Sequence, residues 1–143
     1  MKTERWNSSG KPYGRKCKGM SKISWKPGNM IYPLPAVMVS CGAEGEPDNI
    51  ITVAWTGTIC TNPPMTYISL RPQRHSYHMI EKSGEFVINL TTAELAKATD
   101  FCGVRSGRDL DKFKETGLTR EHGTLSYAPY IKAVSYTHLT LPT

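Results

Sequence analysis

The sequence contains 143 residues, 38% of them hydrophobic, with 12 glycines and 10 prolines, which suits one domain of short strands and many turns. It has no run of about 18 apolar residues, and this excludes a transmembrane helix and membrane binding through one. The net charge of +6 is uneven: residues 1–19 carry +5 and the rest of the chain +1, so the near-neutral body argues against nucleic-acid binding, with a basic arm as the alternative.

The two ends of the chain do not match the pattern of the middle. Residues 1–19 have no period of 2 or 3.6 and are expected to be an unstructured basic head, either an over-extended reading frame before Met20 or a natural tail. Residues 134–143 read VSYTHLTLPT, the in-frame translation of a common sequencing adapter, and a genuine β-prone terminus is the alternative. We therefore expect residues 20–133 to be a partial domain that lacks its natural C-terminus.

The first half of this domain is predicted to contain three strands. Residues 36–41 (AVMVSC) form a short apolar run after Pro35, which predicts a buried strand. Residues 42–48 (GAEGEPD) are rich in turn-forming residues and predict a loop. Strands of mixed polarity are expected over residues 49–56 and, after two consecutive prolines, over residues 65–70.

The second half is predicted to contain short helices around a fourth strand. A helix is expected over residues 76–82, a strand over 85–90, a helix that has Thr91 or Thr92 as its N-cap and runs to about Asp100, and a last helix over 109–115 that ends at Gly117. Strands separated by short helices, without a regular alternation of strand and long helix, predict an α+β domain or a barrel with helical insertions.

The cysteines and histidines do not predict a metal site. The four cysteines stand 24, 19 and 42 residues apart, so no CxxC pair exists. The first ten residues lack the apolar segment of a secretory signal, so we expect reduced thiols and a cytoplasmic protein. His75 and His78 lie three residues apart without a third ligand in view, and surface histidines are the preferred interpretation.

The middle of the chain combines hydroxyl, apolar and basic side chains. Thr52, Thr56 and Thr58 are separated by even numbers of residues and would share one face of an extended strand. Arg71 and Arg74 follow the next strand. Hydroxyl donors and a guanidinium on a loop suit an anionic phosphate. On the residues alone, a plain threonine-rich sheet with solvated arginines remains the alternative.

Four blocks in order resemble the flavin reductase-like family, and most closely its flavoredoxin branch. They are WKPGNM with YPLP (residues 25–35), NIITVAWTGTICTNPPMTYISLR (49–71), EKSGEFVINL (81–90), and DFCG with SGRDLDKF (100–113). Together the blocks cover about residues 23–132, and the resemblance rests on their order, because no single block is a unique signature.

The resemblance implies a mainly β (α+β) fold: an antiparallel Greek-key split barrel of the FMN-binding type with short helices, incomplete at the C-terminus. It also implies a homodimer that binds FMN non-covalently near the subunit interface. The residues that would bind the cofactor are Thr52, Val53, Ala54, Trp55, Thr56, Thr58, Arg71, Ser76, Asn89, Leu90, Thr91, Cys102, Gly103, Ser106 and Lys112.

Within this set, the resemblance implies different roles. Thr52–Trp55 would run along the flavin ring, Thr56 and Thr58 would face the ribityl–phosphate end, and Arg71 would clamp the phosphate. Asn89–Thr91 would form another wall. Cys102 and Gly103 would allow a close backbone approach, and Ser106 and Lys112 would supply further phosphate contacts. Trp55 as a plain core aromatic is an open alternative, and Cys102 is interpreted as a small buried hydrophobe in preference to a redox thiol.

The resemblance also implies that the cofactor carries the redox chemistry, so no catalytic acid–base residue is expected. The first interpretation is an FMN-binding oxidoreductase or electron-transfer flavoprotein that resembles flavoredoxin and exchanges electrons with a redox partner protein. An NAD(P)H-dependent FMN reductase is the alternative. A non-redox module that binds another ligand or nucleic acid is the alternative of a different class.

Overall fold

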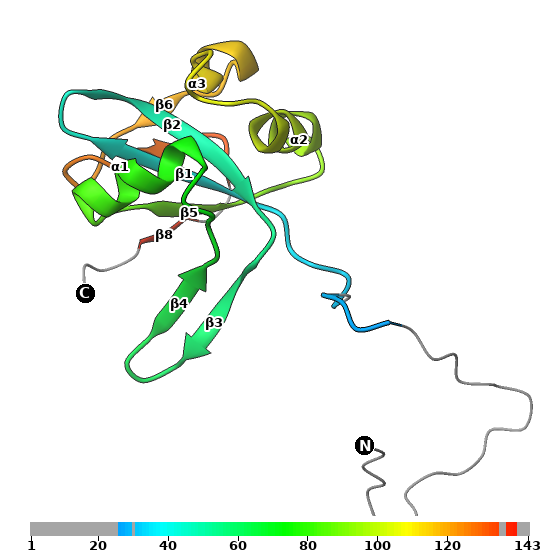
Figure 1. Ribbon diagram of the computed structural model, residues 1–143. Helices are drawn as coiled ribbons and strands as arrows, with labels where there is room; N and C mark the ends of the chain where they lie inside the picture. Colours follow the sequence, from blue (N-terminus) through cyan, green and yellow to red (C-terminus); the bar gives the residue numbers. More distant parts are fainter. Residues whose placement is uncertain (1–25, 30, 135–136, 140–143) are drawn as a thin grey trace, which may run out of the picture. The chain divides into compact units, whose positions relative to one another are not determined.

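The computed structural model describes residues 26–29, 31–134 and 137–139 (Figure 1). The chain divides into two units after Ile31, and all helices and strands given below belong to the second unit. The expected basic head, residues 1–19, lies outside the described residues. Within the described ranges, no helix is long and apolar enough to cross a membrane.

The main sheet has four antiparallel strands in the order β2-β1-β5-β8. They are β1 (Val37–Ala43), β2 (Glu46–Val53), β5 (Val87–Leu90) and β8 (Thr137–Leu139). In the central strand β1, Val37 pairs with Val53 on one side and with Leu90 on the other. Residues 137–139 pair with β5, and the expectation that residues 134–143 are non-native stays a prediction.

β1 is buried along its whole length because both faces of the sheet are covered. Successive side chains of a strand point to opposite faces. Val39 therefore belongs to one core cluster with Ile51, whereas Met38 belongs to a second cluster with Phe113. The buried strand predicted over residues 36–41 is confirmed, and it continues for two further residues.

The turn between β1 and β2 is shorter than the sequence indicated. The loop expected over residues 42–48 is wrong, because β1 continues to Ala43 and β2 begins at Glu46. Glu44 and Gly45 remain as the turn, and Gly45 has a φ of 77°, a left-handed conformation that glycine adopts without a steric penalty. Turn-rich composition located the reversal, but strand pairing fixed its length.

β3 (Thr56–Cys60) and β4 (Met65–Ile68) form a separate hairpin that projects from the main sheet (Figure 1). The continuous strand expected over residues 49–56 is wrong, because the chain bends at residues 54–55, between β2 and β3. The N–H of Ser69 donates to the carbonyl of Trp55 at 2.7 Å and closes the base of the hairpin at the bend. The hairpin therefore leaves the sheet instead of extending β2.

Three short helices lie against the main sheet: α1 (His75–Ser83), α2 (Ala96–Val104) and α3 (Lys112–Thr116). The helix expected over residues 76–82 is confirmed to within one residue at each end. α2 begins at Ala96 and not after an N-cap at Thr91 or Thr92, so that prediction is wrong. The Thr91 hydroxyl instead donates to the carbonyl of Ala36 at 2.8 Å, which holds this residue beside β1.

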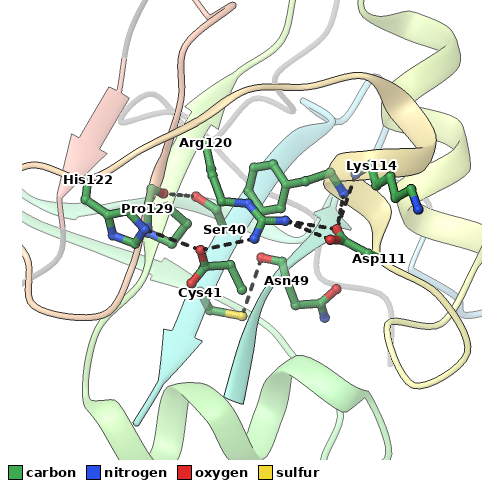
Figure 2. Close-up of polar contacts among 10 residues, drawn as sticks. Ser40, Cys41, Asn49, Asp111, Lys114, Arg120, His122 and Pro129 are labelled. Atoms are coloured by element: carbon green, nitrogen blue, oxygen red, sulfur yellow. Dashed lines mark hydrogen bonds and ion pairs between the residues drawn. The ribbon is translucent and has the colours of Figure 1, made fainter. Parts of the chain in front are cut away.

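α3 begins three residues later than the helix expected over residues 109–115, because Asp111 is its N-cap. One carboxylate oxygen of Asp111 accepts hydrogen bonds from the N–H groups of Phe113 and Lys114, at 2.9 and 3.2 Å (Figure 2). The helix ends at Gly117 as expected, where the backbone has a φ of 68°.

β6 (Arg120–Glu121) and β7 (Tyr130–Ile131) form a further two-stranded sheet after α3. The Arg120 guanidinium donates to both carboxylate oxygens of Asp111, at 3.0 and 2.9 Å, and its central carbon lies 4.6 Å from the centre of the Phe113 ring. Figure 2 shows this ion pair and the hydrogen bond from the Ser40 hydroxyl to the carbonyl of Pro129. These contacts fix the β6–β7 segment to α3 and β1.

The predominance of strands with three short helices confirms the predicted mainly β (α+β) fold. The strands in the described ranges do not close into a barrel, because β2 and β8 are the outer strands of the main sheet. An open sheet of this kind agrees with the expectation of an incomplete split barrel.

Candidate functional site

Two adjacent pockets lie beside β2 and share Ile51 and Arg74 in their linings. The larger pocket has a volume of about 290 Å³ and is lined by residues 51–55, 69–71 and Arg74. The smaller has a volume of about 120 Å³ and is lined by residues 73–76 and 103–107 with Asn49, Ile51 and Lys112. Nine of the fifteen residues predicted to bind the cofactor line one of these pockets: Thr52, Val53, Ala54, Trp55, Arg71, Ser76, Gly103, Ser106 and Lys112.

The larger pocket has the end of β2 and the bend after it as one wall. β2 has only β1 as a neighbour among the described strands, so its outer edge presents backbone N–H and C=O groups that a ligand can use. Trp55 stands at the bend with 51% of its surface exposed, and Arg71 follows β4. An aromatic side chain next to an edge strand suits a flat ring system that has a polar rim.

Thr52 connects the larger pocket to α2. Its hydroxyl donates to the carbonyl of Thr99 in α2. A Cβ placed on Gly103 would lie 3.3 Å from the Cβ of Thr52, a distance at which the threonine would have to shift. The glycine therefore lets α2 pack closely against β2, and the Thr52 hydroxyl is used within the protein. The close approach of the Gly103 backbone to a cofactor stays a prediction.

The smaller pocket contains a buried cation, Lys112, whose exposure is only 3%. Its ammonium donates to the carbonyls of Ile50, at 2.7 Å, and Cys102, at 2.9 Å. An ammonium has three donors, so a third is left for which the described residues supply no acceptor. Burial lowers the pKa of Lys112, and no carboxylate in the described ranges pairs with it. A ligand anion in this pocket would stabilise the charged lysine.

Ser76 and the loop after α2 narrow the smaller pocket. The Asn49 amide donates to the Ser76 hydroxyl oxygen at 2.9 Å, which ties α1 to β2. A Cβ placed on Gly107 would lie 2.3 Å from the side-chain oxygen of Asn49, so only glycine allows the loop to come this close. Ser106, the neighbour of Gly107, is held at the pocket wall as a result.

The surroundings of the smaller pocket are strongly cationic. Arg71, Arg74, Arg105 and Arg108 are all exposed, and none of them forms an ion pair with the part of the chain that the structure describes. α1 also begins at this pocket without a side-chain cap, so its first N–H groups contribute a partial positive charge. The arrangement favours an anion.

The other predicted residues are not brought to the two pockets. Thr56, Thr58 and Leu90 line a separate groove of about 450 Å³ between the β3–β4 hairpin and the main sheet. The bend at residues 54–55 separates these threonines from Thr52, so the predicted common strand face is wrong.

Asn89, Thr91 and Cys102 make internal contacts instead. The Asn89 amide donates to the carbonyl of Met38 and the hydroxyl of Ser40, both at 3.0 Å. Thr91 binds the end of β1 through its hydroxyl, as described above. Cys102 is fully buried, and burial raises the pKa of its thiol, which fits a small hydrophobic residue better than a redox thiol.

The predicted cofactor-binding set did not include several residues that line the smaller pocket, among them Arg74, His75 and Arg105. Arg74 had been noted with Arg71 as a guanidinium that suits a phosphate, but it was not placed in that set. His75 was interpreted as a surface histidine. The signal available was a repeated pattern, because RHS (residues 74–76) and RS (residues 105–106) each place an arginine close before a predicted phosphate-binding serine. Metal ligands do not gather here: no group of three histidine, cysteine or acidic side chains that could hold a metal occurs among the described residues.

Comparison with solved structures gives similar folds. Flavoredoxin of Desulfovibrio vulgaris (Miyazaki F) matches with a TM-score of 0.75 and 32% identity, covering 79% of this chain and 62% of that one. Flavoredoxin from Methanosarcina acetivorans matches with a TM-score of 0.75 and 27% identity, covering 84% and 63%. An FMN-binding domain of a flavin reductases-like enzyme from Shewanella baltica OS155 matches with a TM-score of 0.68 and 26% identity, covering 73% and 55%.

Two sequence relatives match about three quarters of this chain. An uncharacterized protein of Aeropyrum pernix is 30% identical over 107 residues, which are 74% of this chain and 40% of the relative, so the chain spans less than half of that protein. A second uncharacterized protein, from Pyrococcus abyssi, is 26% identical over 103 residues, 72% of this chain and 58% of the relative. The flavin reductase like domain family matches residues 29–138, and the chain therefore belongs to this family.

Proposed function

We propose that the two pockets beside β2 form one FMN site, with the flavin ring in the larger pocket and the phosphate in the smaller. The buried and unpaired ammonium of Lys112 is the observation that carries this proposal, because a buried cation without a carboxylate partner is unfavourable unless an anion joins it. Membership of the flavin reductase like domain family supports FMN as the ligand, and several matched structures are named as FMN-binding.

The phosphate would be held by groups from three parts of the chain. Lys112 and Ser76 supply the buried end, Ser106 supplies a hydroxyl from the loop after α2, and Arg71 and Arg74 supply guanidinium groups between the two pockets. These groups can neutralise a dianionic phosphate, because Lys112 and the two arginines carry three positive charges without acidic partners in the described ranges.

The ring would lie beside the end of β2. Residues 52–55 line this pocket, so backbone groups on the outer edge of the strand are available to its polar rim. The exposed Trp55 offers an aromatic surface for stacking. The two pockets share Ile51 and Arg74, and the ribityl chain would pass over these residues.

With FMN bound, the site would accept and donate electrons as one- or two-electron steps that the flavin itself supplies. We propose an FMN-binding oxidoreductase or electron-transfer protein of the flavoredoxin type. The chain contributes binding, orientation and a cationic environment, and the buried Cys41 and Cys102 take no part, because burial raises the pKa of both thiols, that of Cys41 to about 12.

A second candidate is an NAD(P)H-dependent FMN reductase. It is favoured by the surplus of exposed guanidinium groups, since Arg105 and Arg108 remain after Arg71 and Arg74 are assigned to the flavin phosphate. A nicotinamide dinucleotide carries further phosphates that such groups bind. Bleaching of the flavin absorbance at about 450 nm by NADH or NADPH alone, under anaerobic conditions, would identify the reductase, whereas no bleaching would leave the electron carrier.

The FMN proposal is tested by removing the buried charge while keeping its volume. Lys112→Met should weaken FMN binding by about ten- to a hundredfold, because a charge-assisted hydrogen bond is worth roughly 1.5–3 kcal/mol. Riboflavin, which lacks the phosphate, should bind equally to both proteins. Lys114→Met is the matched control, since Lys114 is an exposed residue of the same helix.

Binding would be measured by quenching of flavin fluorescence, with circular dichroism to establish that each variant is folded. FMN affinity that is the same in wild type and Lys112→Met, or an equal loss of riboflavin and FMN affinity, would contradict the assignment of the phosphate to the smaller pocket.

A further inference from the structure

We propose that His75 is an additional phosphate-binding residue that binds as imidazolium, so that the site takes up one proton when the phosphate of FMN enters. This inference rests on the proposed FMN site and names a residue beyond those assigned to it. His75 is the first residue of α1 and lines the smaller pocket together with Ser76 and Lys112. Its side chain is therefore placed on the same wall as two groups that would contact the phosphate.

The electrostatic surroundings of His75 in the free protein are unfavourable for a positive charge. His78 on the same helix lies with its ring centre 5.0 Å away, Arg108 approaches from the loop after α2, and Lys112 from α3. Burial first, and then these three neighbours, lower the pKa of His75 below its usual range. The imidazole is consequently neutral at pH 7 while the pocket holds no anion.

Among the described residues, Glu46 is the acidic group that acts on His75, and it is already paired. Glu46 of β2 raises the pKa of His75 slightly, but its carboxylate contacts the His78 ring at 2.7 Å and the Lys82 ammonium at 3.4 Å. It cannot offset the cations around the pocket. A phosphate dianion in the pocket would reverse the sign of the local field and favour the protonated imidazole.

The proposal has a defined pH signature. Below the pKa that His75 has in the free protein, the imidazole is charged both with and without FMN. Above the pKa that His75 has in the FMN complex, it is neutral in both states. Between these two values binding takes up a proton, and the dissociation constant for FMN rises by up to about tenfold per pH unit. The second ionisation of the phosphate, near pH 6, acts in the opposite direction, because it makes the ligand more anionic as pH rises.

The test compares FMN and riboflavin affinities from pH 5.5 to 8.5 in wild type, His75→Gln and His78→Gln. His78 is the matched control: it lies on the same helix, 5.0 Å from His75, but its ring contacts Glu46 and it does not line the pocket. In wild type, the FMN affinity should fall by about three- to tenfold between pH 6.5 and 8. His78→Gln should keep this fall but at slightly higher pH, because it removes one of the neighbours that lower the pKa of His75. In His75→Gln the FMN affinity should stay flat or rise, and riboflavin should show no such fall in any protein.

A second readout measures the proton directly. Calorimetric titration with FMN at pH 7 in two buffers of different ionisation enthalpy should give a net proton uptake in wild type that is lost in His75→Gln. Identical pH profiles and proton uptake in these two proteins would overturn the role of His75 while leaving the FMN site intact. Absence of FMN binding to the wild type would overturn the FMN site itself, and this inference with it.

Discussion

The side-chain oxygen of Asn89 accepts a hydrogen bond from the backbone N–H of Ile131 at 3.1 Å, which joins β5 to β7 across 42 residues of sequence. The amide nitrogen of the same side chain donates to the carbonyl of Met38 and the hydroxyl of Ser40. Ser40 in turn donates to the carbonyl of Pro129. One buried amide thus connects the central strand to the segment that carries β7.

Asn89→Ala should lower the free energy of unfolding by about 2–3 kcal/mol. The substitution leaves buried polar groups without partners, and each costs roughly 1–3 kcal/mol, although relaxation of the segment recovers part of that energy. Urea denaturation followed by circular dichroism would measure the change. Gln73→Ala, which removes an exposed amide, is the control and should change stability by less than about 0.5 kcal/mol. Equal stability of Asn89→Ala and wild type would contradict the structural role given to Asn89.

The sequence predicts local elements better than the contacts between them. β1 was predictable because an apolar run of β-branched residues is sufficient to indicate a buried strand. The bend at residues 54–55 was not, because it depends on the hydrogen bond from Ser69 to Trp55, fourteen residues earlier. The close approach of the loop after α2 was not predictable either. Gly107 is required there because Asn49, which belongs to β2, lies directly against it.

For the candidate site too, the sequence indicated individual residues better than their positions relative to one another. Family resemblance identified Lys112 and Ser76, and the structure brings them to one pocket although 36 residues separate them. The resemblance could not indicate that Thr56 and Thr58 belong to the β3–β4 hairpin and lie away from Thr52. The even spacing of these threonines is the same whether the strand continues or bends. The role of Asn89 was also hidden, since its partners lie 49 and 51 residues away.

Arg71→Ala should weaken FMN binding by about tenfold without changing the affinity for riboflavin. Arg71 is exposed and therefore screened by solvent, which places its charge-assisted contact at the lower end of the usual 1.5–3 kcal/mol. The difference between wild type and variant should shrink as salt rises from 50 to 500 mM, roughly the range over which charges on a surface become screened. Fluorescence titration would measure both effects.

Lys97→Ala, which removes an exposed charge from α2 away from both pocket linings, is the control for Arg71→Ala. It should leave FMN affinity unchanged at every salt concentration. If Lys97→Ala weakened FMN binding as much as Arg71→Ala, the effect would be one of net charge, and the assignment of Arg71 to the phosphate would fail.

Asp48 and Asp111 both contact Arg120, but their contributions to the stability of the fold should change with pH in opposite directions. Asp48 lies 3.9 Å from the Arg120 guanidinium and 3.4 Å from the His122 ring. Burial raises the pKa of Asp48 despite these cations. A raised pKa means that the folded state favours the protonated acid, so this contribution to stability is present at low pH and lost as pH rises through the pKa of the folded protein. Asp48→Asn should therefore keep or slightly raise stability at pH 7.

Asp111 should show the reverse. Burial raises its pKa, but hydrogen bonds from the Lys114 N–H and Arg120 outweigh burial, and the pKa of Asp111 is lowered overall. Its contribution is present above the pKa of the unfolded chain, about 3.9, and is lost as pH falls through the lower value of the folded protein. Asp111→Ala should cost about 1 kcal/mol at pH 7 through loss of the N-cap, and less at pH 3.

Thermal unfolding of the two variants at pH 3 and pH 7 would measure both effects, with Asp109→Ala as a control for an exposed aspartate near the same helix. A loss of stability in Asp48→Asn at pH 7 as large as that in Asp111→Ala would show that the ion pairs of Asp48 outweigh its burial, contrary to this prediction.

We propose that the β3–β4 hairpin forms the interface of the homodimer that the family resemblance implies, and Ile59→Asp should then convert the dimer to a monomer. Ile59, Met65 and Tyr67 on this hairpin are 58%, 48% and 45% exposed, and the hairpin borders the 450 Å³ groove. Large apolar side chains that are exposed together on one hairpin are typical of an interaction surface. A buried charge at the centre of an interface weakens association by several kcal/mol, which exceeds the margin of most dimers at micromolar concentration.

Sedimentation velocity at several protein concentrations would determine the oligomeric state of wild type and variants. Val104→Asp is the control for oligomeric state alone, because Val104 is 70% exposed and lies in α2, outside the hairpin, but also lines the smaller pocket. We expect Val104→Asp to stay dimeric and Ile59→Asp to become monomeric with unchanged secondary structure. Because the hairpin leaves the main sheet at the bend that lines the larger pocket, the monomer should also bind FMN more weakly, and a dimeric Ile59→Asp would place the interface elsewhere.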